Sequence, residues 1–136
     1  MSIFRKIGRW LFLSAAFLAT NAAAVEDING LHPSAAEVAS LPKFCWQRFL
    51  GKKFDGPAFR IPSSCGVGMN HYCPGLVQLN RASRSFNNPN HRRWLLRSAR
   101  GSFEYTIKMM RNYPCPLRGQ VNSMLRLVDG LLGGAK

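Results

Sequence analysis

The apolar residues of the chain recur at helical spacing in four separate stretches. The first stretch contains Val38, Leu41, Phe44, Cys45, Phe49 and Leu50. Apolar side chains three or four residues apart share one face of an α-helix. Ser34 followed by Glu37 matches a capping box, which predicts that the helix begins there. Pro42 lacks a backbone donor, so we expect it to kink the segment or divide it into two short helices before Gly51 ends it.

The other three stretches predict three longer helices. The second helix has Asn70 as its cap, Pro74 in its first turn and an apolar stripe of Leu76, Leu79, Ala82, Ser83 and Phe86. The third begins at Asn88 and Pro89 and extends to about residue 112, with an inward face of Leu95, Leu96, Ala99, Phe103, Ile107 and Met110. The fourth carries Leu117, Val121, Met124, Leu125, Val128 and Leu132, and ends at Gly133-Gly134.

The segment between the first two helices has the composition of a loop. Residues 51–69 contain five Gly and Pro residues after Gly51, and a loop of this length in a small domain is usually tethered or functional. Its apolar residues Phe54, Phe59 and Ile61 are expected to lie on the core. No alternating strand pattern occurs anywhere. The sequence therefore predicts an all-α fold of short helical hairpins with a long, disulfide-tethered loop.

The first 24 residues have the pattern of a secretory signal peptide. Arg5, Lys6 and Arg9 precede a short apolar run at 10–19, and Ala22 and Ala24 supply the small residues for cleavage. The apolar run is too short for a membrane anchor, which takes about 20 residues. We therefore expect a mature, exported chain of residues 25–136 that forms a single small domain, located in the periplasm.

Four cysteines, all after residue 24, predict two disulfides in an exported chain. A zinc site formed by the four cysteines, or by three of them with His71, is the alternative, but the spacing contains no C-x₂-C pair. Antiparallel packing of the first two helices favours Cys45–Cys73. The third helix is longer than the second, so its far end favours Cys65–Cys115. The runner-up pairing is Cys45–Cys65 with Cys73–Cys115.

The predicted mature chain is strongly basic. Sixteen Lys and Arg residues and all six acidic residues follow position 24, which gives a net charge of +10. A candidate basic binding face consists of Arg81, Arg84, Arg93, Arg97 and Arg100, with Lys108 further along. It would suit phosphate, lipid head groups or an acidic partner. The alternative is a solvated face that Glu104 partly neutralises. Nucleic acid is not an expected partner of an exported protein.

No motif of an enzyme occurs in the sequence. The chain has no G-x-S-x-G elbow, no HExxH pair and no phosphate-binding glycine loop, so we expect neither catalysis nor a cofactor. His71 is expected to pack at the start of a helix rather than to bind a ligand. A set of aromatic and methionine side chains on the third helix is expected to be core rather than a ligand groove; it comprises Trp94, Phe103, Tyr105, Met109 and Met110.

Three groups of residues carry a family resemblance. They are Asn70-His71-Tyr72-Cys73-Pro74-Gly75-Leu76, then Leu79-Asn80-Arg81-Ala82, then Arg92-Arg93 with Phe103-Glu104-Tyr105. With these residues, the chain from about 41 to 130 resembles small exported proteobacterial proteins described as tetratricopeptide-repeat-like. The resemblance implies helix-turn-helix packing and an interaction or assembly role in the periplasm, and it implies no catalytic residues.

These observations together favour a periplasmic, disulfide-stapled helical adaptor. Its expected partner is another periplasmic or envelope protein, bound through a helix face or groove. The alternative is a basic envelope protein that binds anionic lipid or polysaccharide.

Overall fold

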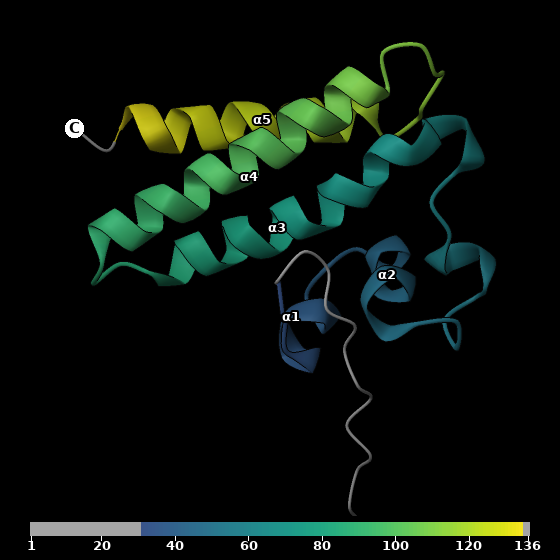
Figure 1. Cartoon of the computed structure of the whole chain (residues 1–136), viewed down its shortest axis with the longest axis horizontal. Coiled ribbons are helices and arrows are strands. Elements are labelled where there is room, and N and C mark those ends of the chain that lie inside the picture. Colours follow the sequence, from purple (N-terminus) through teal and green to yellow (C-terminus); the bar gives the residue numbers. More distant parts are fainter. Residues whose placement is uncertain (1–30, 135–136) are drawn as a thin grey trace, which may run out of the picture.

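The computed structural model describes residues 31–134, and in this range the chain is helical with no β-strand (Figure 1). The α-helices are α1 (Ala35–Ala39), α2 (Trp46–Leu50), α3 (Met69–Arg84), α4 (Pro89–Met109) and α5 (Arg118–Gly133). Short 3-10 helices are η1 (Lys43–Cys45), η2 (Pro57–Phe59) and η3 (Ser63–Gly68). The predicted all-α class is confirmed. The predicted signal peptide, residues 1–24, lies outside the described residues.

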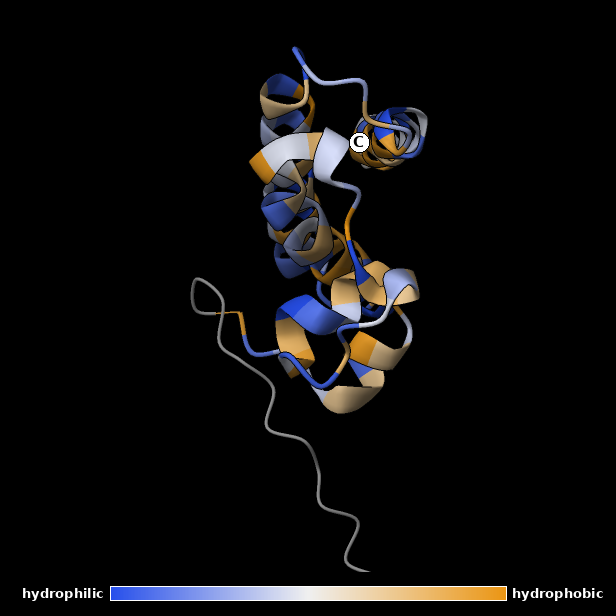
Figure 2. Cartoon of the chain, turned by 90° about the vertical axis from the view of Figure 1, so that its right-hand side faces the viewer, coloured by the Kyte–Doolittle hydropathy of each residue, from blue (hydrophilic) through white to orange (hydrophobic). Residues whose placement is uncertain are grey.

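The fold is built on the α3–α4 hairpin. In Figure 1, α3 lies between α4 on one side and the short α1 and α2 on the other, and α5 runs along α4. Figure 2 shows α5 beside α4 and well away from the α1–α2 pair. None of the helices within residues 31–134 is both long and apolar enough to cross a membrane. Packing of the tetratricopeptide type stays a prediction.

The two helices of the hairpin approach closely because glycine stands at their contact. A Cβ atom at Gly75 would lie 2.7 Å from Cε1 of Phe103 and 2.9 Å from Cβ of Ser102. Ordinary contacts between carbon atoms are about 3.5–4.0 Å. The fully buried rings of Tyr72 and Phe103 then pack with their centroids 5.6 Å apart. Gly75 is therefore what lets α3 lie directly on the Phe103 turn of α4.

The first helix forms as two pieces, as the sequence predicts. The Ser34 hydroxyl accepts a hydrogen bond from the Glu37 amide (3.2 Å), and the Glu37 carboxylate accepts one from the Ser34 amide (2.7 Å). This is the predicted capping box. The chain then breaks at Pro42, whose backbone is extended at ψ 141°, before η1 and α2 begin. Val38, Leu41 and Phe49 are buried on both sides of the break.

Both predicted disulfides are present. Cys45 is bonded to Cys73 with a Cα–Cα distance of 5.6 Å, and Cys65 is bonded to Cys115 with a Cα–Cα distance of 4.3 Å. The second bridge forms because α4, with 21 residues, is longer than the 16-residue α3. The end of α4 therefore lies beside η3, where Gly68 packs against Met109. No cysteine thiol remains to bind zinc.

Several predicted helix boundaries are wrong. Asn70 does not cap α3: the preceding 3-10 turn leads directly into the helix, whose N-cap is Gly68. Pro74 is consequently the sixth residue of α3 and not part of its first turn. Ser83, predicted to face inward, lies within α3 but is exposed. The helix stops at Arg84, so Phe86 lies beyond it with 75% of its surface exposed.

The boundaries of α4 are closer to the prediction. Asn88 caps it through a hydrogen bond from the His91 amide (3.0 Å), and Pro89 is its first residue, as predicted. The helix ends at Met109 rather than near residue 112. Pro114 disfavours helical geometry at the residue before it, and Cys115 must turn back towards Cys65.

Candidate functional site

The acidic residues of the described chain are all paired, which leaves most of its cations without an acidic partner. Four acidic residues lie within residues 31–134, and each forms a salt bridge. The pairs are Glu37 with Arg81, Asp55 with Arg60, and both Glu104 and Asp129 with Arg100. The basic side chains beyond these three arginines determine where an anionic partner would be attracted.

Two members of the predicted basic face, Arg81 and Arg100, belong to these pairs and have acidic partners. Arg81 binds the Glu37 carboxylate through Nε (2.6 Å) and Nη2 (3.2 Å) and also the His32 carbonyl oxygen (3.0 Å). Its role is to hold α1 on α3. The Arg81 hydrogen bond holds the pKa of Glu37 at about 2, against 4.5 for a free carboxyl. Arg100 joins α4 to α5 through Asp129 (2.7 Å).

Two of the remaining arginines of that face, Arg84 and Arg97, lie at the end of the α3–α4 hairpin together with exposed aromatic rings, and Arg93 is an exposed residue of α4. We define the hairpin end as Arg84, Phe86, His91, Trp94 and Arg97. Phe86 is 75% exposed and Trp94 is 59% exposed. The His91 and Trp94 rings stack at 5.9 Å with an interplanar angle of 15°. Arg97 lies three residues after Trp94 on the same exposed face of α4.

Trp94 and Tyr105 correct the prediction that the aromatic side chains of α4 are core. Phe103 and Met110 are fully buried, whereas Tyr105 is 42% exposed. The sequence does carry a signal for the exposure of Trp94. This residue immediately precedes the buried Leu95 and Leu96 in the helix, so its side chain points away from the buried face. Tyr105 covers His71 with the ring centroids 4.2 Å apart, so His71 packs between helices.

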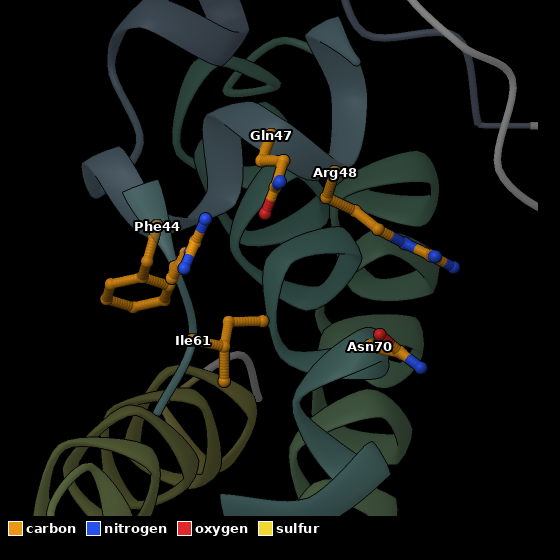
Figure 3. A pocket seen from close by; sticks show the side chains of 6 residues that line it. Phe44, Gln47, Arg48, Ile61 and Asn70 are labelled. Carbon is orange, nitrogen blue, oxygen red and sulfur yellow. The ribbon is translucent and has the colours of Figure 1, made fainter. Parts of the chain in front are cut away.

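A polar pocket lies under α2, between this helix, the loop before η3 and the start of α3 (Figure 3). It has a volume of about 420 Å³ and is lined by Phe44, Gln47, Arg48, Arg60, Ile61 and Asn70. In Figure 3 the polar ends of Arg48 and Asn70 lie on one side of the pocket, Phe44 lies on the other, and Ile61 is between them. Sequence patterns did not indicate this pocket, because its walls come from three separate segments.

The two arginines of this pocket differ in their partners. Arg60 is bound to Asp55 through Nε (3.1 Å) and Nη2 (3.0 Å), and Gln47 donates to the same carboxylate (3.1 Å). Arg48 has no acidic partner within residues 31–134. Its Nε–H is shielded from solvent and makes no hydrogen bond. Arg48 is thus a half-buried cation whose donors are incompletely used.

A second cavity of about 370 Å³ lies between α4 and α5 and has mixed charge. Glu104, Lys108, Arg111 and Arg118 line it beside two apolar side chains, Ile107 and Leu125. Arg118 is engaged in structure, because its guanidinium donates to the carbonyl oxygens of Met110 and Tyr113 at the end of α4. Lys108 and Arg111 form no salt bridge with an acidic residue of the described chain.

Tyr72 is a buried titratable residue of the core. Burial raises the pKa of the Tyr72 phenol to about 12; Gln120 opposes this shift, although the two side chains do not have hydrogen-bond geometry. The Tyr72 ring is held between Phe44 (6.2 Å) and Phe103 (5.6 Å), as expected of a core residue. Within residues 31–134, no three His, Cys, Asp or Glu side chains are grouped as metal ligands would be.

Comparison of the chain with protein-family models, with curated proteins and with solved structures found no match. The candidate sites of this protein are therefore the hairpin end and the Arg48 pocket, both identified from its own residues.

Proposed function

We propose that this protein is an exported, disulfide-stapled helical module that binds another protein in the periplasm through the hairpin end. The two disulfides support an oxidising, exported location. The observation that carries the proposal is the exposure of Phe86 and Trp94 beside cations that no acidic residue of the described chain neutralises. Trp and Arg are the residues that most often dominate the binding energy of protein interfaces.

The rigidity of the hairpin end suits such a role. Trp94 belongs to an α-helix that is capped by Asn88, and its ring is stacked on His91, so little side-chain freedom remains to be lost on binding. The disulfides lie at the opposite end of α3 and α4. The hairpin thus presents its exposed rings on a support that is covalently fixed at the far end.

The test compares capture of a partner from periplasmic extract by the exported protein and by its Phe86→Ser/Trp94→Ser variant. A Tyr113→Ser variant is the matched control, because Tyr113 is also exposed (46%) but lies at the other end of α4. We expect one protein to be retained by the parent and the control and to be lost with the double variant. Equal retention by all three would refute the hairpin end as the interface.

Binding of anionic lipid or polysaccharide is the second candidate, favoured by Arg84 and Arg97 beside the exposed Trp94. Interfacial aromatic rings with adjacent cations also suit a membrane surface. Salt separates the two functions: binding to phosphatidylglycerol vesicles should fall steeply between low and moderate salt, whereas a protein contact centred on Phe86 and Trp94 should change little. Salt-sensitive vesicle binding that Arg84→Gln/Arg97→Gln abolishes would favour this second function.

A further inference from the structure

We propose that the pocket under α2 is a binding site for a carboxylate, with Arg48 as its charged anchor. The site is distinct from the hairpin end and does not depend on the function proposed above. It is formed by six residues from η1, α2, the segment before η3 and the start of α3, and it has the size of a small-ligand pocket.

The first argument concerns charge. Every acidic side chain within residues 31–134 is bound to Arg60, Arg81 or Arg100, and none of them reaches Arg48. Arg48 is nevertheless not a freely solvated surface cation, because its Nε is shielded from water. Because Nε is shielded, a bound anion would reach Arg48 through the Nη groups of its guanidinium. An anion at Arg48 would therefore be held in an environment where screening by solvent is reduced.

The second argument concerns the shape and chemistry of the walls. A guanidinium has donors in a planar fork that matches the two oxygens of a carboxylate. Asn70 adds a side-chain amide on the same side of the pocket, as Figure 3 shows. Ile61 and Phe44 provide an apolar surface further along. The expected ligand thus has a carboxylate at one end and an apolar or aromatic group at the other.

The third argument explains why Arg60 does not compete for the ligand. Asp55 accepts hydrogen bonds from both Arg60 and Gln47, which neutralises Arg60 and fixes the loop that carries Ile61. The pocket therefore has a single unneutralised arginine. This favours a ligand with one negative charge over a polyanion.

The direct test is a titration of the exported protein with benzoate, followed by ¹H–¹⁵N NMR of the backbone and of the arginine Nε–H groups. Benzamide, which has the same shape without the charge, is the control ligand. We expect benzoate to shift the signals of Arg48 and Asn70, and benzamide to shift neither. Arg48→Gln should weaken benzoate binding by about tenfold or more, because a hydrogen bond to a charged group contributes about 1.5–3 kcal/mol.

Arg126→Gln is the matched control variant, since it removes the same charge from an exposed site on α5 and should leave benzoate binding unchanged. If Arg48→Gln fails to fold, Asn70→Ala is the second variant, because Asn70 is exposed and should weaken binding without affecting the fold. N-acetyl-Gly-Gly-Phe and its C-terminal amide distinguish the source of the carboxylate. Tighter binding of the free tripeptide than of benzoate assigns a peptide C-terminus, and the reverse assigns a small acid. No shift at Arg48, or equal shifts by benzoate and benzamide, overturns the proposal.

Discussion

The contact between α3 and α4 at Gly75 allows a test in which the same substitution has unequal effects at two positions. Replacing Gly by Ala inside a helix stabilises it by about 1 kcal/mol through helix propensity alone. At Gly101, in the middle of α4, an added methyl group meets nothing within 4 Å, so only this gain remains. At Gly75 the same methyl group would lie 2.7 Å from the Phe103 ring and 2.9 Å from Ser102.

The cost at Gly75 follows from what must move. Phe103 is fully buried and packed against Tyr72, so its ring cannot rotate away and the two helices must separate by several tenths of an ångström. Overpacking of this kind costs about 1–3 kcal/mol. Because both variants share the gain in propensity, the difference between their unfolding free energies isolates the clash. We expect Gly75→Ala to be less stable than Gly101→Ala by about 1–3 kcal/mol.

The measurement is urea unfolding of both variants with their disulfides intact, followed by circular dichroism at 222 nm. The slope of the free energy with urea should be the same for both, which shows that the unfolded states are comparable. Equal stabilisation by the two substitutions would refute the close approach of α3 and α4 at this position.

Three further predictions concern other parts of the chain. Exported protein should begin at Val25 by intact-mass analysis, and a retained residue 1 would contradict the predicted signal peptide. Replacing both Cys65 and Cys115 by Ser should destabilise the fold by up to about 4 kcal/mol, since this bridge closes a separation of 50 residues; chemical denaturation measures the loss. Glu37, with its pKa lowered to about 2, contributes stability that is complete above pH about 4.5 and is lost as the pH falls towards 2. The Glu37→Gln variant should therefore show a weaker dependence of stability on pH in that window, and an unchanged dependence would contradict the pairing with Arg81.

The local signals in the sequence predicted much of the fold. The Ser34–Glu37 capping box, the break at Pro42 and the start of α4 at Asn88 depend only on neighbouring residues, and all three are confirmed. The disulfide pairing was also predictable, because it follows from helix lengths and antiparallel packing. The prediction extended the apolar stripe of α3 one turn too far, to Phe86. It therefore placed in the core a ring that is exposed.

The candidate sites were predicted less well, because they depend on contacts between distant segments. Helical spacing placed Arg81 on an exposed face, but its partner Glu37 lies 44 residues earlier, on a separate helix. The Arg48 pocket depends equally on where the loop places Ile61 and on how Asp55 occupies Arg60. Helical periodicity predicts the direction in which a side chain leaves its own helix. It does not predict which residues of a distant loop will contact that side chain.

The order of the four cysteines along the chain determines how the molecule responds to proteolysis. The loops closed by Cys45–Cys73 and Cys65–Cys115 overlap, because Cys65 lies between the first pair and Cys73 between the second. A single cut at any peptide bond between residues 45 and 115 therefore leaves the two fragments covalently joined. The helix α5 begins after this region, at Arg118, and a cut just before it would leave α5 attached to α4 only by packing and by polar contacts such as Arg100–Asp129. Residues 45–115 thus form a covalently closed unit, and α5 is linked to this unit only by the backbone that leads into its first residue.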